Sequence, residues 1–189
     1  MSSSKRASMM PAGPKPPTSL SSTLIIADNA TLTGTNLITI GASTIVHPRT
    51  RISCVHAPVT IGSSCILSER SSIGFQSSPS GEGQGRGVVI ENGVVVEIGA
   101  IVEASRIGEG SLIEVNAKVG KGAVLGKHCK IGPLCTVAEG EVLPDFTVVF
   151  GNGQRRIDSS GAQELKLKMV GRQVEVLRKL IPSNLAKFQ

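Results

Sequence analysis

The sequence has almost no aromatic residues: 189 residues include no Trp, no Tyr and only 4 Phe. A core without aromatic rings has to be filled by aliphatic and small side chains, which suits a narrow interior. The sequence also has no apolar run close to the roughly 20 residues that a membrane-spanning helix requires. We therefore expect a soluble protein that does not insert into a membrane.

The chain also has no concentrated basic patch in its central part. Its net charge of +6 comes from the two ends, because residues 1–27 carry 3 basic and no acidic residues, and residues 155–189 carry 8 basic and 3 acidic residues. Residues 28–154 hold 9 basic against 11 acidic residues and are nearly neutral. A nucleic-acid-binding surface of basic residues interleaved with aromatics is therefore not expected.

An aliphatic residue returns at every sixth position through the second half of the chain. The series is Val89, Val95, Ile101, Ile107, Ile113, Val119, Leu125, Ile131, Val137, Leu143 and Val149. A period of six fits neither the 3.6-residue stripe of a helix nor the alternation of a half-buried strand. It is typical of the hexapeptide β-helix, in which each unit of six residues is a short strand followed by a bend.

Small residues form a second column, four positions after each aliphatic residue. Its members are Gly99, Ser105, Ser111, Ala117, Ala123, Cys129 and Cys135. A large and a small side chain can both point inward where the corners of a triangular coil narrow. We therefore predict an all-β solenoid: a parallel β-helix of the three-sided, usually left-handed type, followed by a C-terminal α-helix.

The repeat begins at Leu24 in a looser register. Six-residue steps link Ile26 with Leu32, then Ile40, Val46 and Ile52, then Ile61, Leu67 and Ile73, with the small column at Thr44, Thr50, Cys65 and Ser71. Residues 26–149 would make about seven coils, each rising by ~4.8 Å. Such a rod has two open ends with unpaired backbone groups, which other segments have to cover.

The composition divides the chain into segments. We predict a disordered Ser/Pro-rich extension (1–23), the β-helix (24–151) with an inserted Gly-rich loop (75–88), a connector (152–161), a helix (162–181) and a tail (182–189). The helix is expected to pack on the solenoid through Leu165, Met169, Val176 and Leu180, which share one side at helical spacing.

The four cysteines show neither a CxxC pair nor a secretory context. Cys65, Cys129 and Cys135 fall in the small inward column, where a thiol acts as a compact hydrophobic group. Cys54 lies outside that column. We expect free thiols in a reducing compartment.

The histidines decide which chemistry the fold could support. Zinc catalysis of the carbonic anhydrase type needs three imidazoles around one ion. His47 and His56 are nine positions apart, on different sides or corners, and His128 lies some four coils further along, so no zinc site is expected. Acyl transfer from coenzyme A needs a single histidine as general base, and His128 is the candidate for that role.

Acidic residues recur every six positions at Glu91, Glu97, Glu103 and Glu109. This spacing predicts a solvated edge of the repeat rather than a catalytic carboxylate pair. Lys127 and Asp145 continue the column of Glu91 and Glu109, so opposite charges should neighbour one another there.

Several segments together resemble the dynactin subunit 6 family, small β-helical subunits of the dynactin pointed end. They are TIVHPRTRI (44–52), the loop inserted after Ile73, VVEIGAIVEASRIGEGSLIEVNAKVG (95–120) and LPDFTVVFGNGQRRID (143–158). The resemblance covers approximately residues 24–181. The Ser/Pro-rich extension and the short Gly-rich loop depart from it.

The resemblance implies a non-catalytic structural subunit of the dynein–dynactin machinery, without cofactor or metal. It would pair with dynactin subunit 5 near the pointed-end actin-related protein, support cargo transport, and reside in the cytoplasm on the cytoskeleton. The alternative is a hexapeptide-repeat enzyme, either an acyltransferase or a homotrimer like the γ-class carbonic anhydrases.

Overall fold

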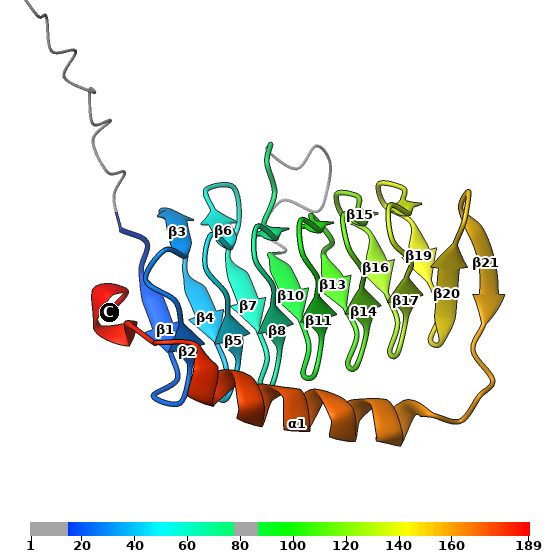
Figure 1. Cartoon of the computed structure of the whole chain (residues 1–189). Coiled ribbons are helices and arrows are strands. Elements are labelled where there is room, and N and C mark those ends of the chain that lie inside the picture. The colour runs from blue at the N-terminus through cyan, green and yellow to red at the C-terminus, as the bar shows by residue number, and fades with distance from the viewer. Residues whose placement is uncertain (1–14, 78–86) are drawn as a thin grey trace, which may run out of the picture.

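The chain forms a parallel β-solenoid that places one short strand on each of three flat sides in every turn (Figure 1). The structure is a computed structural model that describes residues 15–77 and 87–189. These residues make six full turns and two sides of a seventh, close to the seven coils predicted. The predicted hexapeptide-repeat solenoid with a C-terminal helix is confirmed.

Each side of the rod is one sheet. Side A contains β1 (Thr18–Leu20), β4 (Ile38–Ile40), β7 (Val59–Ile61), β10 (Val88–Ile90), β13 (Arg106–Ile107), β16 (Val124–Leu125) and β19 (Val142–Leu143). Side B contains β2 (Ile25–Ile26), β5 (Ile45–Val46), β8 (Ile66–Leu67), β11 (Val95–Val96), β14 (Leu112–Ile113), β17 (Lys130–Ile131), β20 (Thr147–Phe150) and β21 (Gln154–Ile157). Side C contains β3 (Thr31–Gly34), β6 (Arg51–Cys54), β9 (Ser72–Ile73), β12 (Ile101–Val102), β15 (Lys118–Val119) and β18 (Thr136–Val137).

The solenoid begins earlier than predicted, at Thr18 instead of Leu24. Residues 18–20 form β1, which pairs in parallel with β4, and Leu20 packs against the core. The backbone of this segment pairs with β4 and completes side A of the first coil. The polar composition of the segment does not reveal this pairing. The rest of the predicted extension, residues 1–14, lies outside the described residues, as do residues 78–86 of the predicted loop.

The inward frame of the core differs from the predicted series at its start. Ile90, Val96 and Val102 point inward and are at most 1% exposed, whereas Val89 is 39% exposed. The register pairs Ile90 with Ile107, and Ile107 with Leu125 in the next coil. The coil that begins at Ile90 is therefore one residue shorter than the coil that follows it.

From Ile107 onward the predicted frame is confirmed. Ile107, Ile113, Val119, Leu125, Ile131, Val137, Leu143 and Val149 are all buried. The small column is confirmed from Ser111 onward, but the buried small residues before it are Ala100 and Ala104 rather than Gly99 and Ser105. The corner between β12 and β13 is one residue shorter than the later corners, and this shifts the frame.

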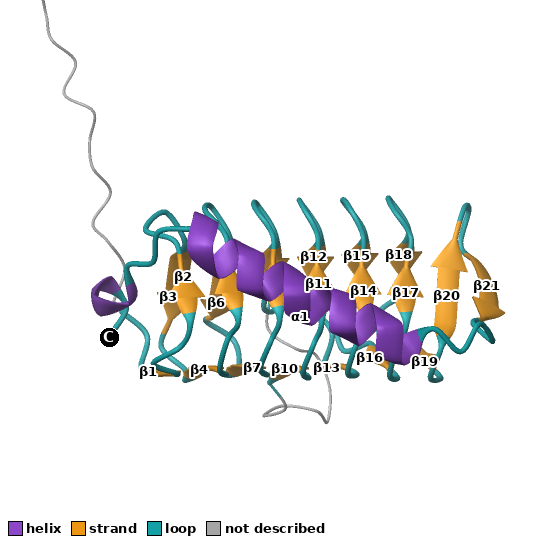
Figure 2. Ribbon diagram, turned by 60° about the horizontal axis from the view of Figure 1, so that its bottom comes forward, coloured by secondary structure: helices purple, strands orange, loops and turns teal. Residues whose placement is uncertain are grey.

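Helix α1 (Gln163–Leu180) lies lengthwise along side B (Figure 2). The outer face of side B is apolar, with Ile45, Ile66 and Val95 contacting the helix together with the partly buried Ile25 and Leu112. Burial of this row explains why the helix packs here. No helix in the described part of the chain has the length and apolarity needed to cross a bilayer.

The helix packs with a face that differs from the predicted one. Val174 is its buried residue, and Val170, Leu177 and Ile181 pack beside it. The predicted contact residues point to solvent and are 56–69% exposed: Leu165, Met169, Val176 and Leu180. The helix carries two apolar stripes, and the apolar outer face of side B is covered by the stripe that contains Val174.

The segments after the last coil cover both ends of the rod. β21, which forms where a connector was predicted, pairs antiparallel with β20 and thereby covers the C-terminal end of side B. At the other end, the tail forms the 3-10 helix η1 (Leu185–Lys187), and Phe188 packs against the core. The backbone N–H of Asn184 donates to the carbonyl of Ile26, 2.9 Å away. β21 and the tail therefore lie at opposite ends of the rod (Figure 1).

Candidate functional site

The chain turns from side A to side B through a column of residues with left-handed backbone, here called the A–B corner. The column consists of Ser43, Ser64, Gly93, Gly110, His128 and Phe146, with φ between 55° and 66°. A left-handed residue is needed because the chain makes a tight bend between two neighbouring strands. His128 and Phe146 are successive members, one coil apart.

The ring of His128 is held in a defined position. It stacks on the ring of Phe146, with centroids 5.6 Å apart and planes 10° from parallel. The backbone N–H of His128 donates to the carbonyl of Glu109 at 2.8 Å. A Cβ on Gly110 would lie 2.5 Å from Nδ1 of His128, so the glycine makes room for the imidazole.

Charged side chains surround this corner in the predicted order. Lys127 pairs with Glu109 at 3.4 Å, and its backbone N–H donates to Oδ1 of Asp145 at 2.8 Å. Glu91 pairs with Arg106 and accepts the backbone N–H of Glu109 at 2.9 Å. Burial raises the pKa of Glu91, but the hydrogen bonds from Arg106 and Glu109 outweigh burial and lower the pKa below its usual value. Glu91 is therefore ionised at neutral pH.

A groove of about 340 Å³ runs between the A–B corner and α1. Its lining consists of Ser63, Ser64, Asn92, Gly93, Glu109, Leu167, Val170 and Gly171. A Cβ on Gly110 would lie 3.2 Å from Cδ2 of Leu167 as well as against His128, so the ring lies beside one end of the groove. The site thus combines hydroxyl and amide groups, an apolar wall from α1 and one imidazole.

The other histidines lie elsewhere. His47 follows β5 at the corner between sides B and C, and His56 follows β6 at the corner between sides C and A. Burial lowers the pKa of His47, and the charge of Glu69 opposes this effect. Within residues 15–77 and 87–189, no group of three or more His, Cys, Asp or Glu side chains could hold a metal ion.

The cysteines are buried and unbonded to one another, as predicted. Burial raises the pKa of Cys65 to about 11 and also raises the pKa of Cys129. Cys54, outside the small column, is buried too, and its thiol donates to the carbonyl of Asn36 at 2.9 Å. These thiols have a structural role.

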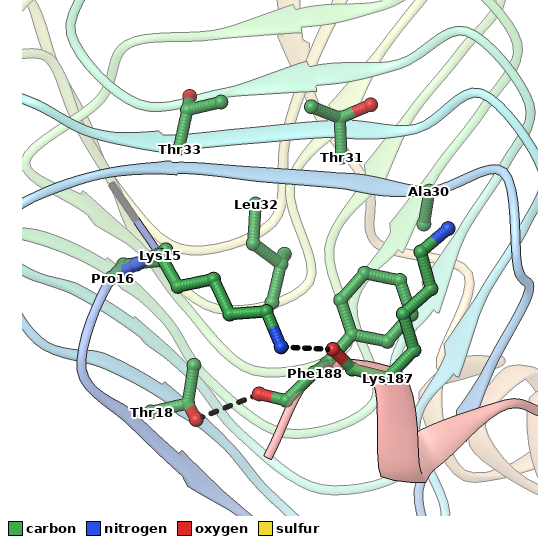
Figure 3. Close-up of a pocket in the computed structure, with 9 residues that line it drawn as sticks. All are labelled: Lys15, Pro16, Thr18, Ala30, Thr31, Leu32, Thr33, Lys187 and Phe188. Carbon is green, nitrogen blue, oxygen red and sulfur yellow. Dashed lines mark hydrogen bonds between the residues drawn. The ribbon is translucent and has the colours of Figure 1, made fainter. Parts of the chain in front are cut away.

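A second cavity, also about 340 Å³, lies at the N-terminal end of the rod (Figure 3). Lys15, Leu32 and Phe188 are among its lining residues. Nζ of Lys15 donates to the carbonyl of Lys187 at 3.0 Å, and Oγ1 of Thr18 donates to the carbonyl of Phe188 at 3.0 Å (Figure 3). These bonds fasten the two ends of the described chain to each other, so the cavity belongs to the cover of the rod. No motif in the sequence marks it.

Comparisons with known proteins agree on the fold. The family model described as bacterial transferase hexapeptide (six repeats) matches residues 104–139, which include Gly110 and His128. A hexapeptide transferase family protein from Anaplasma phagocytophilum has a TM-score of 0.65 at 14% identity, with 86% of this chain and 92% of that chain covered. No curated protein shows significant similarity to the sequence.

A second solved structure with this fold is a putative acetyltransferase from Bacillus cereus. Its TM-score is 0.62 at 19% identity, and 86% of this chain and 91% of that chain are covered. Both structures carry transferase names and neither is a dynactin subunit, so the expectation of a non-catalytic chain is contradicted. The dynactin partners stay a prediction from resemblance. The comparisons establish a hexapeptide-repeat solenoid.

Proposed function

We propose that the chain is an acyltransferase that moves an acyl group from a coenzyme A thioester to a hydroxyl or amine acceptor. One observation carries the proposal: the match to the transferase hexapeptide model spans the coils that hold Gly110 and His128. The names of the two solved structures support the same class of reaction.

His128 would act as the general base. The neutral imidazole takes the proton of the acceptor O–H or N–H while the acceptor atom attacks the thioester carbonyl. The new bond to the acyl carbon forms, the C–S bond breaks, and the proton passes from the imidazole to the leaving thiolate. The stacking on Phe146 fixes the plane of the ring, so little reorganisation precedes the proton transfer.

The groove beside His128 is the proposed place for the acceptor. Ser63, Ser64 and Asn92 supply groups that can hydrogen-bond a polar molecule, and Leu167 supplies an apolar wall. In ligand sites, polar groups of this kind fix the orientation of the bound molecule. The fold places the groove on the rigid solenoid, with α1 as its outer wall.

Thiol release from acetyl-coenzyme A, measured against a panel of amino sugars and simple alcohols, tests the proposal. His128→Gln keeps the size of the side chain but cannot act as a base at neutral pH, so we expect a loss of kcat of about 10²–10⁴-fold. His56→Gln, at a different corner, is the matched control and should keep full activity. Unchanged turnover in His128→Gln, or no acyl transfer to any acceptor, would contradict the proposal.

A further inference from the structure

Helix α1 presents an apolar stripe to solvent on the side away from the rod. Leu165, Met169, Val176 and Leu180 are 62%, 61%, 56% and 69% exposed. At about 100° per residue they lie within roughly 60° of one another, opposite Val174. The stripe is therefore a continuous line along the helix, and nothing in the described part of the chain covers it.

The stripe is symmetric about the middle of the helix. Leu165 and Leu180 are equally distant from the midpoint between Arg172 and Gln173, and Met169 and Val176 are equally distant from it as well. In an antiparallel pair of identical helices centred on this midpoint, Leu165 would meet Leu180 of the other copy, and Met169 would meet Val176. A stripe that reads the same in both directions is what an antiparallel pair of identical helices requires.

The two carboxylates beside the stripe also fit an antiparallel pair. Glu164, Lys168, Arg172, Glu175 and Lys179 all lie along the same flank of it. A two-fold axis brings this flank next to its own copy with the direction reversed. Glu175 then lies within about 3 Å, measured along the axis, of Arg172 and Lys168 of the other copy, and Glu164 lies equally close to Lys179.

Each carboxylate of the flank therefore gains a basic neighbour across the interface. Within the described residues, none of these five side chains has an ion pair. They are free to pair between copies, as the residues that flank coiled-coil seams do.

We propose that two copies of this chain associate through α1, with the two helices antiparallel and the stripes in contact around the midpoint of each helix. α1 is the outermost layer on its side of the rod, so the two rods approach one another without obstruction (Figure 2). Burial of the apolar side chains of both stripes supplies the main driving force. The pairing is independent of the acyl transfer proposed above, because it uses the opposite side of the helix from the groove.

An anionic membrane fits the same stripe less well. Helices that lie on membranes usually carry bulky apolar residues and a uniformly basic polar face. This stripe has no aromatic residue, and the carboxylates of Glu164 and Glu175 interrupt the basic flank.

Sedimentation equilibrium of the full chain measures the association directly. One chain has a mass of 19.6 kDa, and we expect twice this mass at micromolar concentration. Met169→Glu/Val176→Glu places four carboxylates at the centre of the pair and should give monomers. Because both side chains are exposed, circular dichroism should stay unchanged. Leu134→Glu/Val142→Glu, which changes two residues that are 77% and 69% exposed elsewhere on the rod, is the control and should remain dimeric.

Charge reversal tests the flank. Glu175→Lys should weaken the dimer by roughly tenfold, because in each copy the contacts with Arg172 and Lys168 of the other copy become repulsive. Lys168→Glu should weaken it less, because the new carboxylate opposes Glu175 of the other copy but faces Lys179 at the same axial distance. The double variant Glu175→Lys/Lys168→Glu restores opposite charges across the interface and should recover most of the affinity.

Engineered thiols test the direction of the helices. The native cysteines are all buried, so new cysteines on the stripe are the only exposed thiols. Met169→Cys/Val176→Cys should form interchain disulfides on mild oxidation, whereas Met169→Cys alone should not, because its copy lies about 10 Å away along the helix axis. Cross-linking of Met169→Cys alone would indicate parallel helices and overturn the proposal.

Two further outcomes would overturn it. A chain that is monomeric at 100 µM shows no pairing. A dimer or trimer that survives Met169→Glu/Val176→Glu associates through another surface. If the monomer instead binds phosphatidylserine vesicles through Met169 and Val176, a membrane covers the stripe and the pairing is wrong.

Discussion

The first half of the rod, residues 18–73, differs from the second half, residues 88–150, in the length of its coils. In the first half Thr18 pairs with Ile38, and Ile38 pairs with Val59. In the second half Arg106 pairs with Val124, and Val124 pairs with Val142, so each of these later coils uses fewer residues. The inward large residues stay in register in both halves, so the difference lies at the corners.

The additional residues of the first half lie at the corner between sides C and A. There β3 and β6 are four residues long, whereas the later strands of side C have two residues. Nδ2 of Asn36 donates to the carbonyls of Cys54 at 2.8 Å and Val55 at 3.2 Å, which satisfies the wider bend. The solenoid therefore accommodates coils of different length as long as each corner satisfies its backbone groups and the sides keep their pairs.

The largest expected effect tests whether the cores of the two halves are equivalent. Ile52 and Ile107 are both 0% exposed, one in each half. Ile52→Ala and Ile107→Ala should each lower the free energy of unfolding by about 2–5 kcal/mol, because each leaves a cavity in a packed interior. Urea denaturation gives the values, with Thr60→Ala on the outer face of side A as control. A cost at Ile52 well below this range, with the full cost at Ile107, would show that the longer coils are packed more loosely.

The next effect concerns the A–B corner, which both halves share. A Cβ on Gly126 would lie 2.5 Å from the backbone nitrogen of Asp145, and a Cβ on Gly62 would lie 2.6 Å from Oδ1 of Asn92. Gly126→Ala and Gly62→Ala should each cost about 1–3 kcal/mol, because neighbouring coils have to move apart. Gly171→Ala, in α1 with no atom within 4 Å of the new Cβ, should stabilise by up to ~1 kcal/mol. Equal effects at all three sites would contradict the close approach of the coils.

The third effect belongs to the first half alone. Asn36→Ala removes both amide hydrogen bonds to the corner carbonyls, and should cost about 1 kcal/mol, because the carbonyl of Cys54 then keeps only the backbone N–H of Asn36, at 3.3 Å. Asn152→Ala, at an exposed position after the last coil, is the control and should be neutral within about 0.5 kcal/mol. Hydrogen exchange at the corner after β3 should also accelerate. A neutral Asn36→Ala would mean that water replaces the amide at no cost.

The six-residue period predicted the fold and most of the core, but it could not choose the frame at residues 89–102. Val89 and Ile90, Val95 and Val96, and Ile101 and Val102 are adjacent aliphatic pairs. Either member can face inward, and the shorter corner before Arg106 decides between them. Similarly, α1 carries two apolar stripes, and only the apolar outer face of side B selects the one with Val174.

The candidate site was predictable in part. His128 stood out as the residue that acyl transfer would need, although the sequence also permitted a chain with no catalytic residue. The stack on Phe146 follows from their spacing along the chain, which equals one coil of the second half and places both residues at the same corner. The groove could not be predicted, because it depends on α1 folding back over side B.

The smallest expected effect is a pH dependence of stability that arises in the first half at His47. Burial lowers its pKa below the ordinary value of 6.5, against the opposing charge of Glu69. Between the folded and the unfolded pKa, the unfolded chain binds more protons than the folded chain, so stability falls as the pH is lowered below about 6.5 and levels off below the folded pKa. His47→Gln should flatten this part of the profile, measured as urea midpoints from pH 7.5 to pH 5. Glu69→Gln should steepen it, because the charge that favours protonated His47 is removed. An unchanged profile in both variants would mean that His47 is as well solvated in the folded chain as in the unfolded one.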